Sequence, residues 1–473
     1  MLLIIMISTK SALLVASLFL ALVSVSCVDK PDLVIEVFRH GARGALYKTY
    51  DIDNKWGNNV GELTSGGMRM HYLLGSALKK KYPDLLSKYD PVDIYVRSTD
   101  VNRTIMSAYS QLAGVFENMG PSLENDKVVE YALPAYQSSF IQDKVKELNN
   151  TYALPNSLQA VPIHVVPKAY DTVLRSYDAC NRSKEWAAEN SADAVTTSIF
   201  NNEMKEVVSY LKSQGISVSN MNQLSVIGDN CVTNRFQGLP LPGGVTPDDK
   251  YYKDLKFATE YMTVKQHEGT AMQRALYSTP ILNEIKTFIE NYRTSAKSSP
   301  KFVFLSAHDT TLMTILAAFN ITTPECLLEN YRSEKAGKEL LPYPNCVFPQ
   351  YASNLIFEYN SKKSNVTFYY NGVSVPFCQK EVNQCNWSEF KTYISNVTNK
   401  TTVANYNKIC GFEKDAAGTV KKNPSGLSTL ETILIPLCSI LFMSLLGTCV
   451  LFRKKQYARL KRSLSAESLI TDI

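Results

Sequence analysis

Short apolar runs recur along this chain, and each is followed by polar residues and then by a helical pattern. Residues 33–38 form such a run, residues 92–96 alternate between apolar and polar positions, and residues 302–306 form a further apolar run. After each run, apolar residues recur three or four positions apart, which is the spacing of an amphipathic helix. The pattern predicts short buried strands that alternate with helices, as in an α/β sheet with parallel strands.

The first predicted helix starts at Thr64, with Met68, Leu74 and Leu78 along one face. His71 lies within this helix, and we interpret it as a structural residue. Residues 98–100 offer side chains that can cap the start of a second helix. These helices are expected to cover the predicted sheet.

The remaining folded part lacks this regular alternation. Residues 122–299 contain helical patterns and loops, which predict a mostly helical cap inserted over the sheet. Residues 354–359 and 366–370 have the pattern of a β-hairpin. We therefore expect an α/β fold: a three-layer sandwich with a mostly parallel central sheet, a smaller helical cap, and a C-terminal transmembrane helix.

Two long apolar segments predict the compartment and the topology. Residues 1–27 resemble a secretory signal peptide with cleavage near Ser26 or Cys27, although a buried core helix is the alternative. Residues 432–452 carry no charge and are long enough to cross a bilayer. Basic residues follow from Arg453 onward, so residues 453–473 are expected to be cytosolic.

This pattern predicts a single-pass protein whose main domain, residues 28–416, lies outside the cytosol and is joined to the span by a stalk at 417–431. A lipid anchor that replaces the span is the alternative. The basic cluster and the polar tail argue against it.

Cysteines and glycosylation sequons agree with the secretory pathway. The cysteines outside the span and the signal boundary lack zinc-site spacing and favour disulfides. They are Cys180, Cys231, Cys326, Cys346, Cys378, Cys385 and Cys410. The candidate glycosylation sites are Asn149, Asn181, Asn320, Asn365, Asn386, Asn396 and Asn399.

Composition narrows the class of protein further. The chain has 473 residues, 45% of them hydrophobic and 20% charged, which is typical of a globular protein. Its net charge of +6 is small for this length, so we expect no nucleic-acid partner.

Candidate chemistry follows the predicted strands. Arg39, His40 and Arg43 lie on a glycine-containing turn after the first strand, Arg97 ends the second, and His308 and Asp309 follow the strand at 302–306. Ligands of open α/β sheets bind at the carboxyl ends of the strands, so these residues are expected to meet there. Guanidinium groups bind phosphate oxygens in a bidentate manner, and a neutral imidazole can attack phosphorus.

Several segments in the same order resemble those of the histidine acid phosphatases, a branch of the phosphoglycerate-mutase-like superfamily. The segments are residues 39–43, 61–64, 68–75, 96–104 and 306–311. Within this family, the chain is most similar to the prostatic and lysosomal acid phosphatases.

This resemblance implies the role of each site residue. His40 would be the nucleophile that forms a phosphohistidine, and Asp309 would protonate the leaving alcohol and then activate water. Arg39, Arg43, Arg97 and His308 would bind the phosphate. The implied enzyme needs no cofactor or metal ion. We therefore expect an acid phosphatase that is most active at acidic pH.

The resemblance also implies small phosphate monoesters as substrates, and a lysosomal or cell-surface membrane as the location. It allows a homodimer. Two alternatives remain open: a catalytically inactive phosphatase-fold membrane receptor, and an enzyme with phytase-like or lipid-phosphate specificity.

The resemblance implies the disulfides Cys180–Cys410 and Cys378–Cys385. The sequence departs from the family at Asn354, where the prostatic branch usually has a cysteine that would pair with Cys231. Either one cysteine of the loop at 326–346 pairs with Cys231, or Cys326 and Cys346 pair with each other and leave Cys231 free.

Overall fold

The computed structural model describes residues 30–50, 55–123, 125, 128, 132–136, 138–148, 152–378, 383–414 and 420–422. It separates into two units, one that ends at Cys410 and one that begins at Gly411. The second unit contains a small antiparallel pair, β9 (Phe412–Lys414) and β10 (Val420–Lys422). Because β10 lies within the region predicted as a stalk, part of that region has regular structure.

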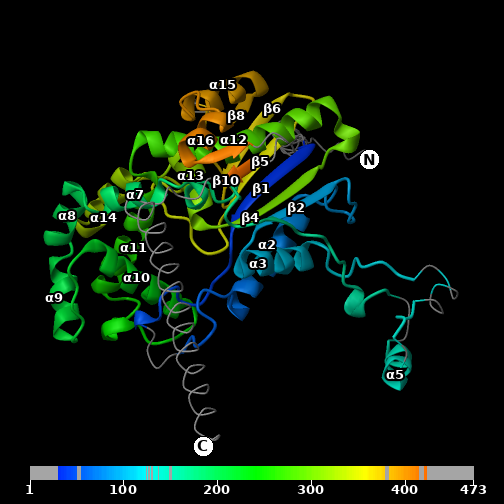
Figure 1. The fold of residues 1–473 in the computed structure, drawn as a ribbon, viewed down its shortest axis with the longest axis horizontal. Helices are drawn as coiled ribbons and strands as arrows, with labels where there is room; N and C mark the ends of the chain where they lie inside the picture. The colour runs from blue at the N-terminus through cyan, green and yellow to red at the C-terminus, as the bar shows by residue number, and fades with distance from the viewer. Residues whose placement is uncertain are drawn as a thin grey trace, which may run out of the picture. The chain divides into compact units, whose positions relative to one another are not determined.

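The first unit is built on a mixed sheet with the strand order β3-β2-β4-β1-β5-β6-β7, and β8 pairs with β6 (Figure 1). The strands are β1 (Leu33–Arg39), β2 (Ile94–Thr99), β3 (His164–Val166), β4 (Phe302–Ala307), β5 (Asn354–Asn360), β6 (Asn365–Tyr370), β7 (Val373–Ser374) and β8 (Gln384–Asn386). The ladders among β1 to β4 are parallel, and those that involve β5 to β8 are antiparallel. The expectation of a mostly parallel sheet is therefore wrong, whereas the predicted hairpin is confirmed as β5 and β6.

Helices cover both faces of this sheet and form a separate helical cluster. They are α2 (Ser65–Lys81), α3 (Asn102–Val115), α5 (Ser139–Glu147), α6 (Ser176–Ala179), α7 (Ser183–Ser191), α8 (Ala194–Asn201), α9 (Lys205–Ser213), α10 (Met221–Phe236), α11 (Lys250–Glu268), α12 (Ala271–Thr294), α13 (Asp309–Ala318), α14 (Pro324–Lys335), α15 (Trp387–Val397) and α16 (Val403–Cys410). By contrast with the helices of these layers, α5 has no buried residues.

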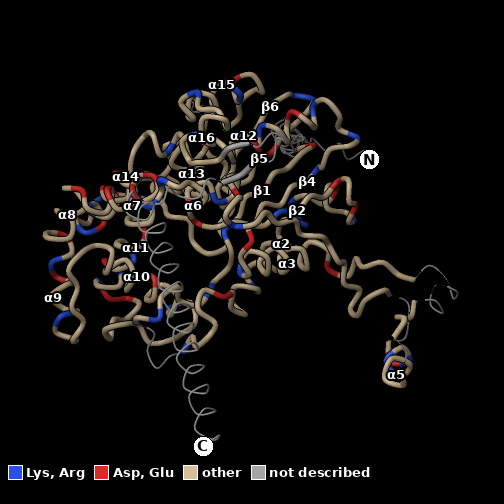
Figure 2. Tube along the Cα trace, in the orientation of Figure 1, with Lys and Arg blue, Asp and Glu red and all other residues tan. Residues whose placement is uncertain are grey.

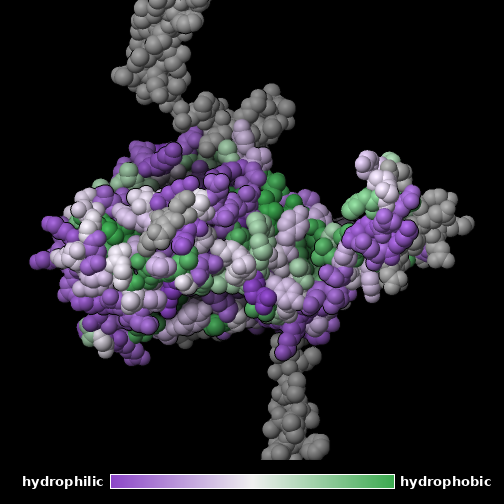
Figure 3. Space-filling model, turned by 90° about the horizontal axis from the view of Figure 1, so that it is seen from below, coloured by the Kyte–Doolittle hydropathy of each residue, from purple (hydrophilic) through white to green (hydrophobic). Residues whose placement is uncertain are grey.

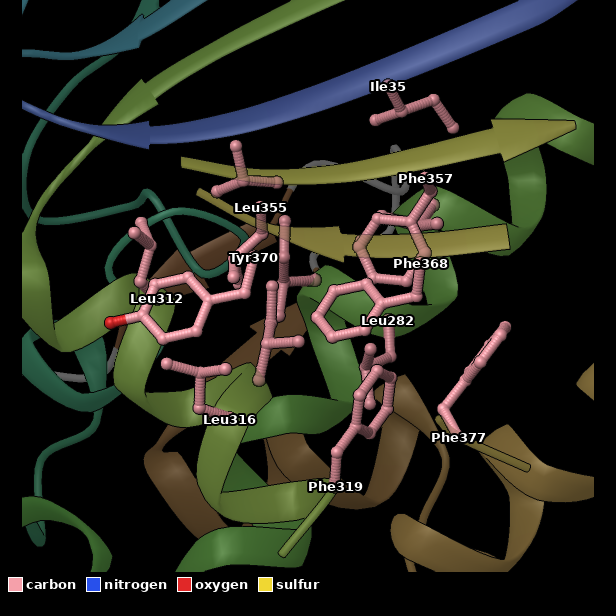
Figure 4. Close-up of a cluster of buried hydrophobic side chains, with 14 of the residues drawn as sticks. Ile35, Leu282, Leu312, Leu316, Phe319, Leu355, Phe357, Phe368, Tyr370 and Phe377 are labelled. Atoms are coloured by element: carbon pink, nitrogen blue, oxygen red, sulfur yellow. The ribbon is translucent and has the colours of Figure 1, made fainter. Parts of the chain in front are cut away.

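The core on one face of the sheet is rich in aromatic side chains. Residues of β1, β5 and β6, such as Ile35, Phe357 and Phe368, pack against Leu282 of α12 and Leu316 of α13 (Figure 4). Strand residues alternate between the two faces of a sheet, so their neighbours in sequence form the opposite core. That second core joins β1, β2 and β4 to α2 and α3. The sheet is therefore the middle layer of three.

The interface between α2 and α3 depends on glycine. The first predicted helix does start after Thr64, whose hydroxyl accepts a hydrogen bond from the N–H of Gly67. The expected face is confirmed at Leu78, which is buried, and at Leu74, which packs against the core, but Met68 is 38% exposed. Gly67, His71 and Gly75 complete the buried face. A Cβ at Gly75 would lie 2.0 Å from the carbonyl oxygen of Gln111 in α3, so the two helices touch through their backbones.

A third hydrophobic cluster forms the core of the helical cap. It takes residues from α8 to α11 and also from α14, for example Leu224, Leu255 and Leu328. Within the region predicted as cap, α12 packs instead on the sheet, through Ile281, Ile285 and their neighbours. The cap cluster thus draws on α14 beyond residue 299, while α12 belongs to the sheet layers.

The surface seen in Figure 3 is mostly hydrophilic, with hydrophobic residues scattered over it. Among the described residues, no helix has the length and apolar character that a bilayer span requires. The span predicted at 432–452 lies outside the described residues, as do the predicted signal peptide and cytosolic tail.

The disulfides Cys180–Cys410 and Cys378–Cys385 are present, as the resemblance implies. Cys326 pairs with Cys346, and Cys231 is a buried free thiol, so the second of the two open alternatives is the correct one. Asn354, at the expected cysteine position, instead donates a hydrogen bond of 2.7 Å to the buried carboxyl of Glu36.

Most candidate glycosylation sites are accessible. Asn320, Asn386, Asn396 and Asn399 are exposed, and Asn181 and Asn365 are half-buried. Asn149 lies outside the described residues.

Two fully buried carboxyl groups make the stability of this fold depend on pH. Burial raises the pKa of Glu36 to about 7 and that of Glu268 to about 8. A carboxyl whose pKa is raised by folding stabilises the protein fully below its unfolded value, near 4.5, and this contribution is lost as the pH rises through the folded value. Burial also lowers the pKa values of His71 and His267 to about 4, which favours unfolding on the acid side.

We expect the Glu268→Gln variant to lose less stability than the wild type between pH 5 and pH 8. The introduced amide stays neutral and can still accept the hydrogen bond of 2.6 Å that Thr314 donates to Glu268. Between pH 4.5 and 7, the raised pKa of Glu268 costs the wild type roughly 3 kcal/mol, at 1.36 kcal/mol per pH unit. Chemical denaturation across this pH range measures the difference. The exposed Glu189→Gln is the control, and equal pH slopes for Glu268→Gln and wild type would contradict the prediction.

Candidate active site

Three parallel strands end side by side and carry the site. In the ladders, Arg39 of β1 lies opposite Ala307 of β4, and Ser98 of β2 lies opposite Ser306 of β4. The residues directly after β1 and β4 are His40 and His308, and their rings lie 5.6 Å apart. The register of the sheet therefore brings together the two histidines that the sequence placed at one edge.

A close approach of two glycines shapes the turn that carries His40. A Cβ at Gly41 would lie 2.3 Å from the carbonyl oxygen of Gly67, and one at Gly67 would lie 2.2 Å from that of Ala42. Side chains at these positions would push the turn away from the first turn of α2. The N–H of Gly41 also donates a hydrogen bond of 3.1 Å to Ser107 of α3. The turn is thus held between two helices.

His40 has a defined protonation state. Its Nδ1 lies 2.9 Å from the carbonyl oxygen of Gly41, which can only accept, so Nδ1 carries the hydrogen and Nε2 keeps its lone pair. Burial, followed by the positive charges of Arg103, Arg39 and Arg43, holds the pKa of His40 well below its ordinary value. The ring is therefore a neutral imidazole with a free lone pair in a cationic environment.

Arg39 and Asp309 form an ion pair across the edge of the sheet. The Nη2 of Arg39 lies 2.7 Å from an Asp309 oxygen, while Nη1 donates to the carbonyl oxygen of Pro349. The guanidinium also lies over the ring of Tyr351, 4.4 Å from its centroid. Burial tends to raise the pKa of Asp309, but Arg39 and Arg43 outweigh it and lower the pKa.

Arg43 is held by a carboxylate from the cap. Asp229 of α10 accepts hydrogen bonds of 2.6 Å and 3.2 Å from the two terminal nitrogens of Arg43. The side chain of Arg43 is 4% exposed, and a bidentate pair of this kind fixes its orientation. Asp229 was not among the residues predicted from the sequence, because the cap carries no motif that marks it.

Arg97 has a different set of partners. β2 extends to Thr99, so Arg97 sits two residues before its end and pairs in register with Leu305. Its guanidinium makes a hydrogen bond of 2.6 Å to the buried carboxylate of Asp171 and lies 3.9 Å from Glu284 of α12. Arg97 is therefore part of a buried ion pair, and none of the described hydrogen bonds joins it to His40 or His308.

Two other arginines lie beside His308 instead, although neither was predicted. Nη2 of Arg103, in the first turn of α3, is 3.3 Å from Nδ1 of His308. Nη1 of Arg175 is 2.8 Å from Nε2. Arg103 lies within the 96–104 segment, so its position in the predicted helix was the available signal. Arg175 lies in the loop between β3 and α6, where the sequence offered no signal.

Arg103 differs from its neighbours in lacking an acidic partner. Among the described side chains, no carboxylate forms an ion pair with it. Burial and the nearby Arg43 lower the pKa of Arg103 to about 10. Figure 2 shows the basic and acidic residues along the chain. The edge thus holds a guanidinium whose charge an anion could balance.

No group of three or more His, Cys, Asp or Glu side chains in the described part of the chain is arranged to hold a metal ion. The donors at this edge, guanidinium and imidazole groups, match an oxyanion such as phosphate instead.

Comparison with known proteins identifies relatives of this chain. The family described as histidine phosphatase superfamily, branch 2, matches residues 32–371. Bovine lysosomal acid phosphatase is 28% identical over 323 residues, which cover 66% of this chain and 64% of that protein. Mouse prostatic acid phosphatase is 28% identical over 324 residues, covering 64% of this chain and 74% of the relative. The matched region thus spans slightly less than two thirds of the bovine lysosomal protein.

Solved structures show the same fold at low sequence identity. The phytase of Citrobacter braakii superposes with a TM-score of 0.51 at 15% identity, covering 80% of this chain and 99% of that chain. The Hafnia alvei phytase in complex with myo-inositol hexakis sulphate gives 0.51 at 14% identity, covering 78% and 97%.

We expect Gly67→Ala to destabilise the protein because its Cβ would overlap the backbone of the His40 turn. Overpacking of this kind costs about 1–3 kcal/mol. Gly66→Ala is the matched control in the same helical turn, because its Cβ would meet nothing closer than 3.6 Å. Thermal unfolding of both variants is the measurement. Equal melting temperatures would show that the close backbone contact is not needed.

Proposed function

The chain belongs to branch 2 of the histidine phosphatase superfamily, and from this membership we propose that it is an acid phosphatase that hydrolyses phosphate monoesters. The observation that carries the proposal is the state of His40: a neutral imidazole, 2% exposed, with Nδ1–H bound to Gly41 and its Nε2 lone pair free. Arginines surround it and can neutralise the oxygens of a transferring phosphoryl group.

In the proposed reaction, Nε2 of His40 attacks phosphorus and the bond from phosphorus to the ester oxygen breaks. Asp309 gives its proton to the departing alcohol, and a phosphohistidine remains. Water then attacks this intermediate, Asp309 takes up a proton, inorganic phosphate leaves, and His40 is restored. The phosphohistidine carries positive charge on its ring, which the Gly41 carbonyl at Nδ1 stabilises.

Asp309 must be protonated to act as an acid, although Arg39 and Arg43 lower its pKa in the free site. A bound phosphate dianion competes for these guanidiniums and repels the carboxylate, and both effects raise the pKa of Asp309. Substrate binding therefore favours the acidic form, and low pH assists it. This is the physical basis for proposing activity at acidic pH.

For the phosphate contacts we propose Arg39, Arg43, Arg103 and His308. Arg103 takes the place first expected for Arg97, because it lies beside His308 and has a charge to be balanced. Phytase-like and lipid-phosphate specificities remain alternatives on the same site, and the solved phytases share only the fold. The three disulfides and the lysosomal and prostatic relatives support a secretory-pathway location; membrane attachment remains a proposal from the sequence.

The first test is hydrolysis of p-nitrophenyl phosphate by the full chain near pH 5, with and without a chelator. Activity that the chelator leaves intact and that His40→Ala abolishes is expected. A well-folded wild-type protein without activity on p-nitrophenyl, inositol or lipid phosphates would contradict the proposal and favour the inactive receptor.

Asp309→Asn tests the proton donor through the leaving group. General acid catalysis contributes about 10²–10⁴-fold when the departing group is basic. We expect kcat/KM to fall by that order for an alkyl phosphate, and by much less for p-nitrophenyl phosphate, whose phenolate leaves without a proton. Equal losses for both esters would assign Asp309 another role.

Arg103→Met and Arg97→Met should separate binding from stability. Arg103→Met removes a phosphate donor, so inhibition by inorganic phosphate weakens about tenfold or more while the melting temperature changes little. Arg97→Met leaves Asp171 buried without its partner, which typically costs about 3–5 kcal/mol of stability. If Arg97→Met weakens phosphate inhibition and leaves stability intact, Arg97 rather than Arg103 is the phosphate-binding arginine.

A further inference from the structure

Arg175 reaches the site from the loop between β3 and α6 rather than from a strand end. It lies directly before α6, is 6% exposed, and forms an ion pair with Asp178. Nη1 points to His308 and lies 2.8 Å from its Nε2. Neither the family resemblance nor the sequence pattern assigns this arginine a role.

The contacts of His308 present a conflict in hydrogen bonding. Nε2 faces Arg175, and Nδ1 faces Nη2 of Arg103 at 3.3 Å. Guanidinium nitrogens only donate hydrogen bonds, and a neutral imidazole offers one lone pair and one N–H. Only one of these two contacts can therefore be a hydrogen bond.

The distances decide which contact is the hydrogen bond. A separation of 2.8 Å is too short for two donors, so Nε2 accepts from Arg175 and the hydrogen lies on Nδ1. The hydroxyl of Thr99, 3.0 Å from Nε2, can then only donate, and it would share this one acceptor with Arg175. Nδ1–H and Arg103 are then two donors that converge, and none of the described hydrogen bonds places an acceptor between them.

The charges around His308 keep its ring neutral. Burial, and then the positive charges of Arg103, Arg175, Arg39 and Lys168, hold its pKa well below the ordinary value. His40 is neutral, Asp178 pairs with Arg175, and Asp309 pairs with Arg39. A cationic His308 would place a further N–H against Arg175, so both charge and geometry favour the neutral ring.

We propose that Arg175 is a positioning residue that fixes His308 in its neutral Nδ1–H tautomer, so that Nδ1–H and Arg103 donate to one shared acceptor, a phosphoryl oxygen of the substrate. This inference rests on the proposed phosphatase function. Without Arg175, Nε2–H can donate to Thr99 and the Nδ1 lone pair can accept from Arg103. In that tautomer, Nδ1 would occupy a hydrogen of Arg103 that is otherwise available to the phosphate. Nδ1 would also present a lone pair, instead of an N–H, toward the phosphate oxygens.

The tautomer can be observed directly, without any catalysis. The chain contains five histidines, so nitrogen NMR of the full-length protein with ¹⁵N-labelled histidine gives few signals, and His308→Gln identifies the one of interest. Near pH 6 we expect Nδ1–H for His308 in the wild type and a shift toward Nε2–H in Arg175→Met. A wild-type ring with Nε2–H, or an Arg175→Met ring that keeps Nδ1–H, would overturn the proposal.

Two further variants separate the hydrogen bond from the charge. Arg175→Lys retains a donor for Nε2 and should preserve the Nδ1–H tautomer. Lys168→Met removes a cation that also lowers the pKa of His308 but that is not among the described hydrogen-bond partners of the ring, so the tautomer should not change. A tautomer change in Lys168→Met equal to that in Arg175→Met would show that charge alone sets the state, against the proposal.

Kinetics then connects the tautomer to the reaction. For Arg175→Met we expect kcat/KM on p-nitrophenyl phosphate to fall about tenfold or more, with a new ionisation in the acidic limb as His308 becomes easier to protonate. Arg175→Lys should recover part of the loss. An Arg175→Met enzyme with wild-type kcat/KM and pH profile would refute the positioning role. If the wild type has no activity, the proposed function fails while the NMR result still decides the tautomer.

Discussion

Each buried guanidinium at the sheet edge needs an opposite charge nearby, because removing an unbalanced ion from water costs several kcal/mol. The structure supplies a separate aspartate to most of them: Asp309 to Arg39, Asp229 to Arg43, Asp171 to Arg97 and Asp178 to Arg175. These pairs join β1 to α13, the turn after β1 to α10, and β2 to the loop after β3. Arg103 remains the cation that a substrate anion can balance, and both histidines stay neutral in this field.

The sequence predicted the strand ends better than it predicted the arginines. Apolar runs identified β1, β4 and the turns that carry His40 and His308, because buried parallel strands have a strong hydrophobic signal. β2 was expected to end near residue 96, yet it continues to Thr99. That extension places Arg97 within the strand, while Arg103, in the first turn of α3, lies beside His308. The register of a strand end is decided by pairing with β4, which a single sequence does not display.

Three further residues, Asp229, Arg175 and Asn354, were harder to predict for a different reason. Asp229 lies in α10 and Arg175 lies in the loop after β3, and only the folded chain brings them to the edge. Asn354 appeared to be a missing cysteine, but it lies across from Phe38 and donates to Glu36, which also accepts a hydrogen bond from Gln111. A polar network thus occupies the place of an expected disulfide, and Cys326 pairs within its own loop.

The ion pair between Arg43 and Asp229 makes the sheet edge depend on the cap. Asp229 belongs to α10, whose apolar side chains pack in the cap core, whereas Arg43 belongs to the turn after β1. The cap therefore supplies the counter-ion of an arginine that belongs to the sheet edge. A minimal chain reduced to the sheet and its covering helices would keep His40 but leave Arg43 buried without a partner. Loss of the carboxylate at this position of α10 would leave Arg43 without its counter-ion, so the cap helix is constrained by the chemistry of the sheet edge.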